Sequence, residues 1–519
     1  MDNFMNLLNG QLVVLDSNGN MEVFPLNGDL FIIGRKNGPN DIGINSPIVS
    51  SQQGAISREG GNYYYNDLAS TNGTLVGQTL LKSSGAPSPR VALRDGDVLQ
   101  IGSTENDRVY MIFDSNSSKN FLWQRLSVNG ASPITIGRGV DNTIVIPNIN
   151  VSRRHAVIYN QPGSVTVEDA NSANGTVLND SMLKGRQPFN SGDVLRIPST
   201  KIARLGDYIL YGIPVAAKSN DVVTYTANIE SKNIQVESYE NYEYARNGGV
   251  QVVVENVSRL VKCKKGTGID GSNKKYILRN VSLTINPGEL VAILGGSGAG
   301  KTTFMNCING FEPATEGRVL VNGTELYKNY QSIKSSIGYV PQQDIVHDNL
   351  TLESMLMYTG KLRLPKDITN QELSQRVAEV LDMVDLTPEK DTFIKKLSGG
   401  QRKRASIAVE LVSDPTLFFL DEPTSGLDPE AETNLMHQLQ GLSAKKGKTV
   451  IVITHTLQNI RLFDKVIFLA PGGKLCFYGS PDDACKFFEV DNLADAYEKI
   501  SADIDGYVNK YNAYAKKGA

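Results

Sequence analysis

The sequence predicts a multidomain protein in which two all-β sandwiches precede one α/β domain with a mainly parallel sheet. Residues 1–213 contain short apolar runs separated by Gly, Asn, Asp and Ser turns, a pattern typical of β-sandwiches. Four short blocks within this region recur in the same order about 100 residues later, which indicates a duplicated domain. From residue 250 onward, strand-like and helix-like segments alternate, as in a parallel sheet covered by helices.

Composition excludes several classes of protein. A length of 519 residues corresponds to three or four domains of about 100–200 residues each. The net charge of −3 provides no basic surface for nucleic acid, so no nucleic-acid partner is expected. The four cysteines show no Cys-x-x-Cys spacing, which argues against a disulfide framework or a structural zinc site. The N-terminus lacks a basic n-region, and no window approaches the roughly 18 apolar residues of a membrane helix. We therefore expect this chain itself to be soluble.

The repeated blocks define the duplication. Phe31–Arg35 recurs as Ile134–Arg138, Val49–Gln53 as Val151–His155, Ser70–Thr74 as Ser172–Thr176, and Asp95–Leu99 as Ser191–Leu195. Solenoid units are only about 20–50 residues long, so the longer offset here indicates duplication of a whole domain. A Ser/Asn stretch separates the copies, and we place the two domains at residues 1–114 and 121–213.

The ordered blocks resemble those of fork-head-associated (FHA) domains, which are β-sandwiches whose end loops bind phosphothreonine. A phosphate monoester needs a guanidinium fork with hydroxyl and amide donors on rigid loops. In the second copy, the resemblance implies that Arg138, Ser152 and Arg153 bind the phosphate. It also implies that Asn174 holds the peptide backbone and that His155 braces the loop. The implied partners are a phosphothreonine peptide or protein and a Ser/Thr kinase.

The first copy departs from this pattern. It keeps three of the binding residues, at Arg35, Ser50 and Asn72. Thr71 adds a hydroxyl, but Gln53 replaces the bracing histidine, and Ser51 stands where the second copy has Arg153. We expect weaker phosphopeptide binding here, or an interaction role without phosphate.

Residues 214–249 read as a polar linker rich in Glu, Asn, Ser and Tyr. Within it, Thr226 is followed three residues later by Ile229. FHA domains often prefer an apolar residue at that offset. Thr226 is therefore either a phosphoswitch or an ordinary exposed threonine.

A glycine-rich loop lies inside the third domain. The apolar run Leu290–Leu294 reads as a buried strand, and a helical pattern begins at Thr303. The Gly-x4-Gly-Lys-Thr order between strand and helix is that of a P-loop, whose backbone N–H groups and helix N-terminus bind phosphate oxygens. We expect Lys301 to reach the outer phosphates and Thr302 to bind Mg²⁺. The nucleotide-binding candidates are Gly295, Gly296, Ser297, Gly298, Ala299, Gly300, Lys301, Thr302 and Thr303.

A second apolar strand ends in two acids. Leu417–Leu420 leads into Asp421 and Glu422. Asp421 is a candidate Mg²⁺ ligand, since Mg²⁺ prefers carboxylate and phosphate oxygens. Glu422 is then placed to polarise a water molecule for in-line attack on the γ-phosphate.

The Leu-Ser-Gly-Gly-Gln segment Leu397–Gln401 ends twenty residues before Asp421 (421 − 401 = 20). Together with the P-loop and the acidic strand end, it resembles the ATP-binding-cassette (ABC) ATPases. The resemblance implies ATP and Mg²⁺ as cofactors, and a dimer in which each signature faces the γ-phosphate bound by the other copy. It assigns Gln342 to Mg²⁺ and water, Asp428 to the D-loop and His455 to the γ-phosphate. The implied signature contacts are Ser398, Gly399, Gly400 and Gln401.

The predicted fold is thus two all-β FHA sandwiches followed by an α/β P-loop NTPase, the ABC nucleotide-binding domain, at residues 250–490. Arg402–Arg404, Glu422–Asp428 and Gly472–Gly479 look like the G-subfamily (white/pleiotropic-drug) exporters. The resemblance implies an ABC-2-type membrane domain, downstream on this chain or on a separate chain. It also implies a position on the cytoplasmic side of the cell membrane. Residues 491–519 are expected to form a connector.

Two questions stay open at this point. The alternative function is a soluble ABC ATPase recruited by its FHA domains to phosphorylated partners. Only 96 positions separate Lys301 from Leu397 (397 − 301 = 96), without the heptads of chromosome-type ABC ATPases, and only one cassette is present, which favours the exporter. The base is also open, because Val261 occupies the place of the usual adenine-stacking aromatic. Tyr276 could replace it, and GTP could be hydrolysed beside ATP.

Overall fold

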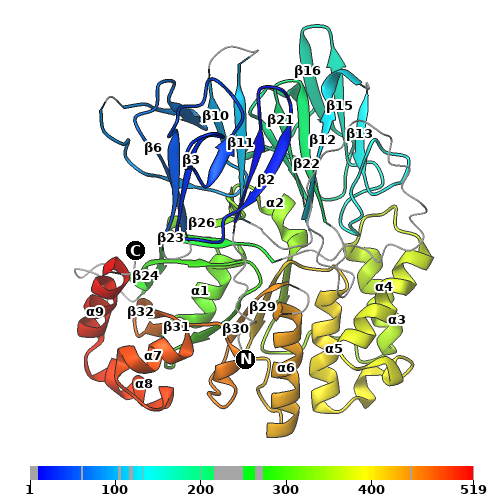
Figure 1. The fold of residues 1–519 in the computed structure, drawn as a ribbon. Helices are drawn as coiled ribbons and strands as arrows, with labels where there is room; N and C mark the ends of the chain where they lie inside the picture. The colour runs from blue at the N-terminus through cyan, green and yellow to red at the C-terminus, as the bar shows by residue number, and fades with distance from the viewer. Residues whose placement is uncertain are drawn as a thin grey trace. The chain divides into compact units, whose positions relative to one another are not determined.

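The structure, a computed structural model, describes residues 10–59, 62–83, 85–102, 107–115, 121–130, 133–198, 200–214, 249–263, 273–444 and 447–517. Thr226 and almost all of the expected linker lie outside the described residues. The chain forms two compact units, Met1–Arg246 and Asn247–Ala519, and each is described by itself (Figure 1).

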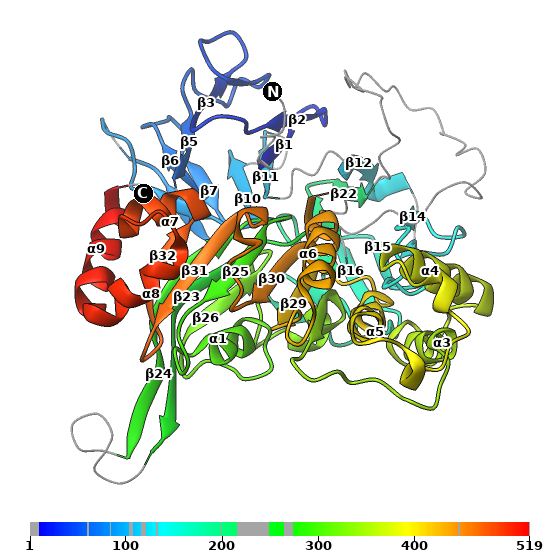
Figure 2. The same cartoon turned by 90° about the horizontal axis from the view of Figure 1, so that it is seen from below.

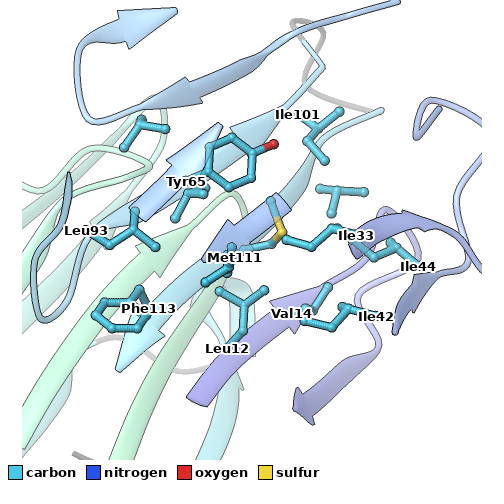
Figure 3. Close-up of a cluster of buried hydrophobic side chains, with 14 of the residues drawn as sticks. Leu12, Val14, Ile33, Ile42, Ile44, Tyr65, Leu93, Ile101, Met111 and Phe113 are labelled. Carbon is cyan, nitrogen blue, oxygen red and sulfur yellow. The ribbon is translucent and has the colours of Figure 1, made fainter. Parts of the chain in front are cut away.

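The first copy in the N-terminal unit is a sandwich of two antiparallel sheets. One sheet has the strand order β2-β1-β11-β10-β7-β8 and the other β4-β3-β5-β6-β9. Their apolar side chains meet between the sheets, as Figure 3 shows for Leu12 and Met111 on one side and Ile33 and Tyr65 on the other. The strands are β1 (Gln11–Leu15), β2 (Met21–Pro25), β3 (Leu30–Arg35), β4 (Ile42–Ile44), β5 (Gly54–Glu59), β6 (Asn62–Asp67), β7 (Thr74–Val76), β8 (Thr79–Leu81), β9 (Val91–Leu93), β10 (Val98–Ile101) and β11 (Val109–Asp114).

The second copy repeats the sandwich with one change in connectivity. Its sheets have the orders β12-β22-β21-β20-β17-β18 and β14-β13-β15-β16-β19. Matching β17, β18, β20 and β21 to β7, β8, β10 and β11 leaves β22 in the place of β1. The sheet position filled by the first strand in copy one is therefore filled by the last strand in copy two. The strands are β12 (Phe121–Ser127), β13 (Ile134–Gly137), β14 (Ile144–Val145), β15 (Ala156–Gln161), β16 (Ser164–Asp169), β17 (Val177–Leu178), β18 (Ser181–Met182), β19 (Gln187–Pro188), β20 (Val194–Ile197), β21 (Thr200–Leu205) and β22 (Tyr208–Pro214).

The two copies share a third apolar cluster. Strand β11 is buried on both faces, because Met111 and Phe113 point into the core of their own sandwich while Tyr110 and Ile112 point to the second copy. The cluster comprises Val13, Leu15, Tyr110, Ile112, Trp123, Val194, Ala203, Leu205 and Leu210. The β1-containing sheet of copy one therefore packs face to face on the β22-containing sheet of copy two.

The C-terminal unit is built on a ten-stranded sheet with the order β27-β26-β23-β24-β32-β31-β25-β30-β29-β28. Strands β25, β29 and β30 are buried along their whole length, as expected for parallel strands covered on both faces. The strands are β23 (Val252–Lys262), β24 (Lys274–Ile285), β25 (Leu290–Leu294), β26 (Glu316–Val321), β27 (Thr324–Glu325), β28 (Ile337–Val340), β29 (Leu417–Asp421), β30 (Thr449–Ile453), β31 (Lys465–Ala470) and β32 (Lys474–Gly479).

Two groups of helices in this unit, α3–α5 and α7–α9, stand apart in both views (Figures 1 and 2). The expected connector is helical, and Lys510 of α9 donates hydrogen bonds to the Phe487 carbonyl and to Glu489, so this segment packs back on the cassette. The helices are α1 (Lys301–Ile308), α2 (Tyr330–Ile333), α3 (Leu352–Arg363), α4 (Asn370–Met383), α5 (Gly399–Leu411), α6 (Pro429–Ala444), α7 (Pro481–Phe488), α8 (Leu493–Ala502) and α9 (Ile504–Lys517). No helix in the described part of the chain is long and apolar enough to cross a membrane.

Candidate functional site

The nucleotide site is assembled at one edge of the parallel sheet. Strands β25, β28, β29 and β30 run in the same direction, so their carboxyl ends meet at the same edge. The P-loop follows β25, Gln342 follows β28, Asp421 ends β29 and His455 follows β30. Ligands of open α/β sheets bind outside the carboxyl ends of the strands.

The P-loop glycines supply backbone conformations that other residues rarely adopt. Gly298 has φ 75° and Gly300 has φ 87°, both in the left-handed region. Gly300 precedes α1 without giving it a side-chain cap, so the first N–H groups of the helix remain available to an anion. The loop can therefore curl its N–H groups around phosphate oxygens.

Lys301 is folded over this loop. Its Nζ donates hydrogen bonds to the carbonyl oxygens of Gly295 at 2.9 Å and Gly296 at 3.1 Å. Burial lowers the pKa of Lys301, while the nearby carboxylates of Glu422 and Asp421 act in the opposite direction. A cation held among weak carbonyl partners can exchange them for phosphate oxygens.

Thr302 and Asp421 form a pair of oxygen donors. The Thr302 hydroxyl donates a hydrogen bond to Asp421 Oδ2 at 3.2 Å. Burial raises the pKa of Asp421, and the adjacent charge of Glu422 adds to this, while the Thr302 hydrogen bond opposes it. A hard cation would favour the ionised carboxylate, and two adjacent oxygens on separate elements suit the preference of Mg²⁺ for oxygen ligands. The residues present therefore fit the expected metal.

Glu422 connects the three loops of the site. Its Oε2 accepts a hydrogen bond from Gln342 Nε2 at 2.8 Å, and its Oε1 lies 2.6 Å from His455 Nε2. Its backbone is left-handed, with φ 47°, an uncommon conformation for a residue other than glycine. Such backbone strain is often retained at functional sites.

The signature segment begins α5. Ser398 and Gln401 form a reciprocal capping box, in which each side chain accepts a hydrogen bond from the other residue's backbone N–H. A Cβ added to Gly399 would meet nothing within 4 Å in the described structure, so this helix end is open to a ligand. Asp428 caps the next helix, α6, by accepting hydrogen bonds from two backbone N–H groups.

The structure thus brings together Lys301, Thr302, Gln342, Asp421, Glu422 and His455. Among the described residues, neither the signature residues Ser398–Gln401 nor Asp428 is hydrogen-bonded to that group. This separation is what a signature that completes the site of another copy requires.

Sequence reasoning missed one residue next to the site. Lys403 is buried, and its Nζ donates a hydrogen bond to the Gln342 carbonyl at 3.0 Å and lies 3.2 Å from Asp344 Oδ1. The lysine therefore ties α5, which begins with the signature, to the loop that carries Gln342. The Arg402–Arg404 run was the only signal, and such runs are usually solvated.

The candidates for base recognition lie on neighbouring strands. Tyr276 pairs with Leu260 and Val261 with Lys275 in the β23–β24 ladder. Strand β24 passes close to the P-loop, since a Cβ on Gly300 would lie 2.8 Å from the Ile277 carbonyl oxygen. Both candidates are therefore near the loop, and which of them meets the base stays a prediction.

In the second sandwich, the predicted phosphothreonine residues lie on three loops at one end. Arg138 follows β13, Ser152 and Arg153 precede β15, and Asn174 precedes β17. The Ser152 hydroxyl accepts a hydrogen bond from Ala173 N at 3.0 Å, and Asn174 Nδ2 donates one to the Asn150 carbonyl at 2.7 Å. These bonds join the loops that carry the proposed phosphate contacts.

His155 holds the Ser152 and Gly175 loops together. It is fully buried, its Nδ1 accepts a hydrogen bond from Ser152 N at 3.2 Å, and its Nε2 lies 3.1 Å from the Gly175 carbonyl oxygen. The carbonyl can only accept, so Nε2 carries the proton. One neutral imidazole thus fixes two loops.

In the first sandwich, Gln53 makes the same two bonds. Its Oε1 accepts a hydrogen bond from Ser50 N at 3.1 Å, and its Nε2 donates one to the Gly73 carbonyl at 3.0 Å. The other loop bonds are also repeated, from Thr71 N to Ser50 Oγ at 3.0 Å and from Asn72 Nδ2 to the Ile48 carbonyl at 2.7 Å. Loss of the histidine therefore gives no reason to expect a looser first site. Binding strength stays a prediction.

A second pair of bracing residues also went unnoticed in the sequence. Asn40 Nδ2 donates hydrogen bonds to the carbonyls of Arg35 and Ser51, and Asn142 Nδ2 donates to those of Gly139 and Arg153. Each asparagine lies four or five residues after the arginine of a Gly-Arg pair, and this was the available signal.

Comparisons with known proteins match both kinds of domain. Residues 278–425 match the family model "ABC transporter", and residues 31–102 and 134–198 each match "FHA domain". The chain is 36% identical over 380 residues to the ABC transporter ATP-binding/permease protein Rv1747 of Mycobacterium tuberculosis, covering 73% of this chain and 39% of that protein. It is 38% identical over 229 residues to ABC transporter G family member 28 of Arabidopsis thaliana, covering 42% of this chain and 20% of that protein.

Two further similarities concern the cassette. Protein white of Drosophila melanogaster is 35% identical over 254 residues, covering 45% of this chain and 36% of that protein. The dimeric structure of MJ0796, a bacterial ABC transporter cassette, is 29% identical with a TM-score of 0.40, covering 44% of this chain and 98% of that one. The chain spans about two fifths or less of the length of these curated relatives. Residues 278–425 thus match the ABC transporter family and are similar to its G-family members, and two segments that match the FHA domain precede them.

Proposed function

We propose that this chain is the ATP-hydrolysing part of an exporter and that its FHA domains bind phosphothreonine to regulate it. The observation that carries the hydrolytic part is the convergence of Gln342 and His455 on the Glu422 carboxylate, beside Lys301 and Thr302. The longer relatives, one of them named as an ATP-binding/permease protein, support an ABC-2-type membrane domain, in cis or as a separate chain, on the cytoplasmic side of a cell membrane.

The chain's own residues suit in-line attack by water on ATP. The P-loop N–H groups and Lys301 bind and orient the β- and γ-phosphates. Glu422 accepts the proton of the attacking water, while Gln342 and His455 hold the carboxylate and the water in position. Thr302, Asp421 and Gln342 would hold Mg²⁺, which supplies charge to the phosphate oxygens when bound.

Each site requires a second copy of the chain in this proposal. The open N-terminus of α5 at Ser398–Gln401 is separate from the chain's own P-loop group, so it is available to cap the γ-phosphate held by a partner. Head-to-tail closure on two ATP molecules would drive the membrane domains. Binding of phosphothreonine by Arg138, Ser152, Arg153 and Asn174, and by Arg35, Ser50, Thr71 and Asn72, would place this cycle under control of a Ser/Thr kinase.

The test of the hydrolytic role is Glu422→Gln. This isosteric change keeps hydrogen bonding but removes the proton acceptor, so ATPase turnover is expected to fall about 10²–10⁴-fold, with an ATP-bound dimer accumulating. The matched control is Glu498→Gln, an exposed acid on α8 outside the site. Turnover of the Glu422→Gln variant at the wild-type rate would show that Glu422 is not the base.

A further inference from the structure

The two FHA copies are joined by paired contacts that repeat with the roles of the copies exchanged. The strand registers make Tyr110 and Lys201 equivalent, because Gln100 faces Tyr110 and Arg196 faces Lys201 at matching places in β10–β11 and β20–β21. The sequence repeat makes Asp95 equivalent to Ser191.

Both equivalent pairs meet across the interface. The Tyr110 hydroxyl lies 2.8 Å from Ser191 Oγ, and Lys201 Nζ donates a hydrogen bond to Asp95 Oδ1 at 2.5 Å. Each copy therefore presents the same strand and the same turn to the other. This is the pattern of an isologous interface, made here within one chain.

The interface contains buried ion pairs. Lys201 also donates to Asp114 Oδ1 at 2.6 Å, and the side chains of both aspartates are 1% exposed. Burial alone would lower the pKa of Lys201, but the charges of Asp114 and Asp95 outweigh it and raise the pKa, so the lysine stays charged. Arg196 adds a hydrogen bond to the Asp95 carbonyl at 2.9 Å. Such an interface holds the two sandwiches in one orientation.

In the first copy, the phosphate loops lie at the Tyr110 end. Asn72 precedes β7, and Leu75 of β7 pairs with Gln100 near the end of β10, which leads into β11 and Tyr110. Asp95 and Asp114 lie at the opposite end, where Gly96 N donates to the Phe113 carbonyl.

In the second copy, the phosphate loops lie at the Lys201 end. Asn174 precedes β17, and Val177 pairs with Arg196, which faces Lys201. Ser191 lies at the opposite end, where its hydroxyl accepts a hydrogen bond from Gly206 N. Since Lys201 meets Asp95 and Tyr110 meets Ser191, the phosphate-loop end of each sandwich lies beside the far end of the other.

We propose that the FHA pair is a rigid two-ended adaptor that holds two phosphothreonine segments of separate chains at once and joins them. This rests on the proposed phosphothreonine binding. The two loop sets face opposite directions and are separated by at least the length of β11, whose six residues span about 17 Å from first to last. Two phosphothreonines with a one-residue spacer have Cα atoms at most about 7 Å apart, too close to reach both ends.

The two ends also differ in chemistry. The first offers the Thr71 and Ser51 hydroxyls where the second has Ala173 and the Arg153 guanidinium. The second end therefore carries more positive charge and suits a more acidic segment, so the adaptor joins two unlike partners.

Bridging by the full chain tests the proposal. Two phosphothreonine peptides are selected from a degenerate library, each for binding to one end only, so that a dimer with a single kind of end cannot bridge them. One peptide is immobilised, and the other, fluorescent, is supplied in solution. Wild type is expected to capture the soluble peptide on the surface, whereas Arg35→Ala/Ser50→Ala and Arg138→Ala/Ser152→Ala should each bind one peptide and capture none. Binding at the remaining end is the control for folding in each variant. Unphosphorylated peptides should give no capture.

The outcomes distinguish the adaptor proposal from the proposed phosphothreonine binding on which it rests. A bisphosphorylated peptide with a one-residue spacer should bind within about two-fold of a singly phosphorylated peptide, because it reaches only one end. More than ten-fold tighter binding, lost in both double variants, would overturn the two-ended arrangement. One peptide bound per chain would overturn the adaptor alone. No phosphopeptide bound at either end would overturn the FHA function as well.

Discussion

Replacing Lys201 by methionine removes the buried cation between the FHA copies while keeping most of the side-chain volume. Asp95 and Asp114 would then remain buried without their shared partner. Breaking a buried ion pair on one side costs about 3–5 kcal/mol. For a unit of this size each kcal/mol shifts the melting temperature by about 2–4 °C, so a drop of about 6–20 °C is expected.

The protein contains its own reporter for this measurement. Trp123 is the only tryptophan of the chain, is 4% exposed, and its Nε1 donates a hydrogen bond to Asp114 Oδ2 at 3.2 Å. Tryptophan fluorescence during urea unfolding of the full chain therefore follows the FHA interface and not the cassette. The matched control is Lys184→Met, an exposed lysine of the same unit.

The loss of stability in Lys201→Met should depend on pH. In the wild type, burial would raise the pKa of Asp95, but Lys201 and Arg196 outweigh it and hold the pKa below its ordinary value. A carboxyl group of this kind stabilises the folded state at pH values above its pKa in the unfolded chain. This contribution is lost as pH falls through its pKa in the folded protein. Without Lys201, burial would dominate and raise the pKa of Asp95, so the penalty of Lys201→Met is largest at neutral pH and shrinks as the carboxyl protonates in acid. A variant within about 0.5 kcal/mol of wild type at pH 7 would refute the reasoning.

Three further predictions concern the other contacts. Gln53→His should keep phosphopeptide affinity at the first FHA site. Gln53→Leu cannot bond Ser50 N and the Gly73 carbonyl, so it should weaken that affinity about 5–30-fold. Calorimetry with the second site disabled measures both variants, and equal affinity in both would contradict the bracing role. Lys403→Met should lower the ATPase rate about 10-fold with little change in ATP affinity, because it releases the Gln342 loop from α5. Lys366→Met, on the exposed surface, serves as control. An unchanged rate in Lys403→Met would argue against this link. Mixing inactive Lys301→Ala and Ser398→Arg chains should restore about one quarter of wild-type ATPase activity, because half of the dimers would each contain one intact site out of two. No recovery in a mixture that forms dimers would argue against sites shared between copies.

The nucleotide site could be predicted in detail because its chemistry follows strand ends. Lys301, Asp421 and His455 each follow or end a short apolar run, and parallel strands bring such positions to one edge. The local backbone of the P-loop is dictated by its glycines. The bond from Lys403 to the Gln342 carbonyl could not be predicted, because it depends on how α5 packs beside β28 and not on spacing in the chain.

The FHA loops were predicted from their residues, but the way the copies join was not. A Ser/Asn stretch between repeats is typical of independent domains, and nothing in the blocks indicates that β22 replaces a first strand. One signal was available. Val109–Phe113 is an unbroken apolar run, whereas a strand with one face in water alternates, so burial of both faces of β11 was readable in principle. Gln53 misled because an amide can present an acceptor and a donor at nearly the same places as an imidazole.

The placement of β22 has a mechanical consequence. The chain leaves the FHA unit through this strand, which is hydrogen-bonded to β12 along one edge and to β21 along the other. A pull on its end at Pro214 would load both ladders in shear, so many hydrogen bonds would have to break together instead of one at a time. A strand held on one edge only would peel more easily. The chain therefore leaves the FHA unit through a strand that is hydrogen-bonded on both edges, which resists tension better than an edge strand would.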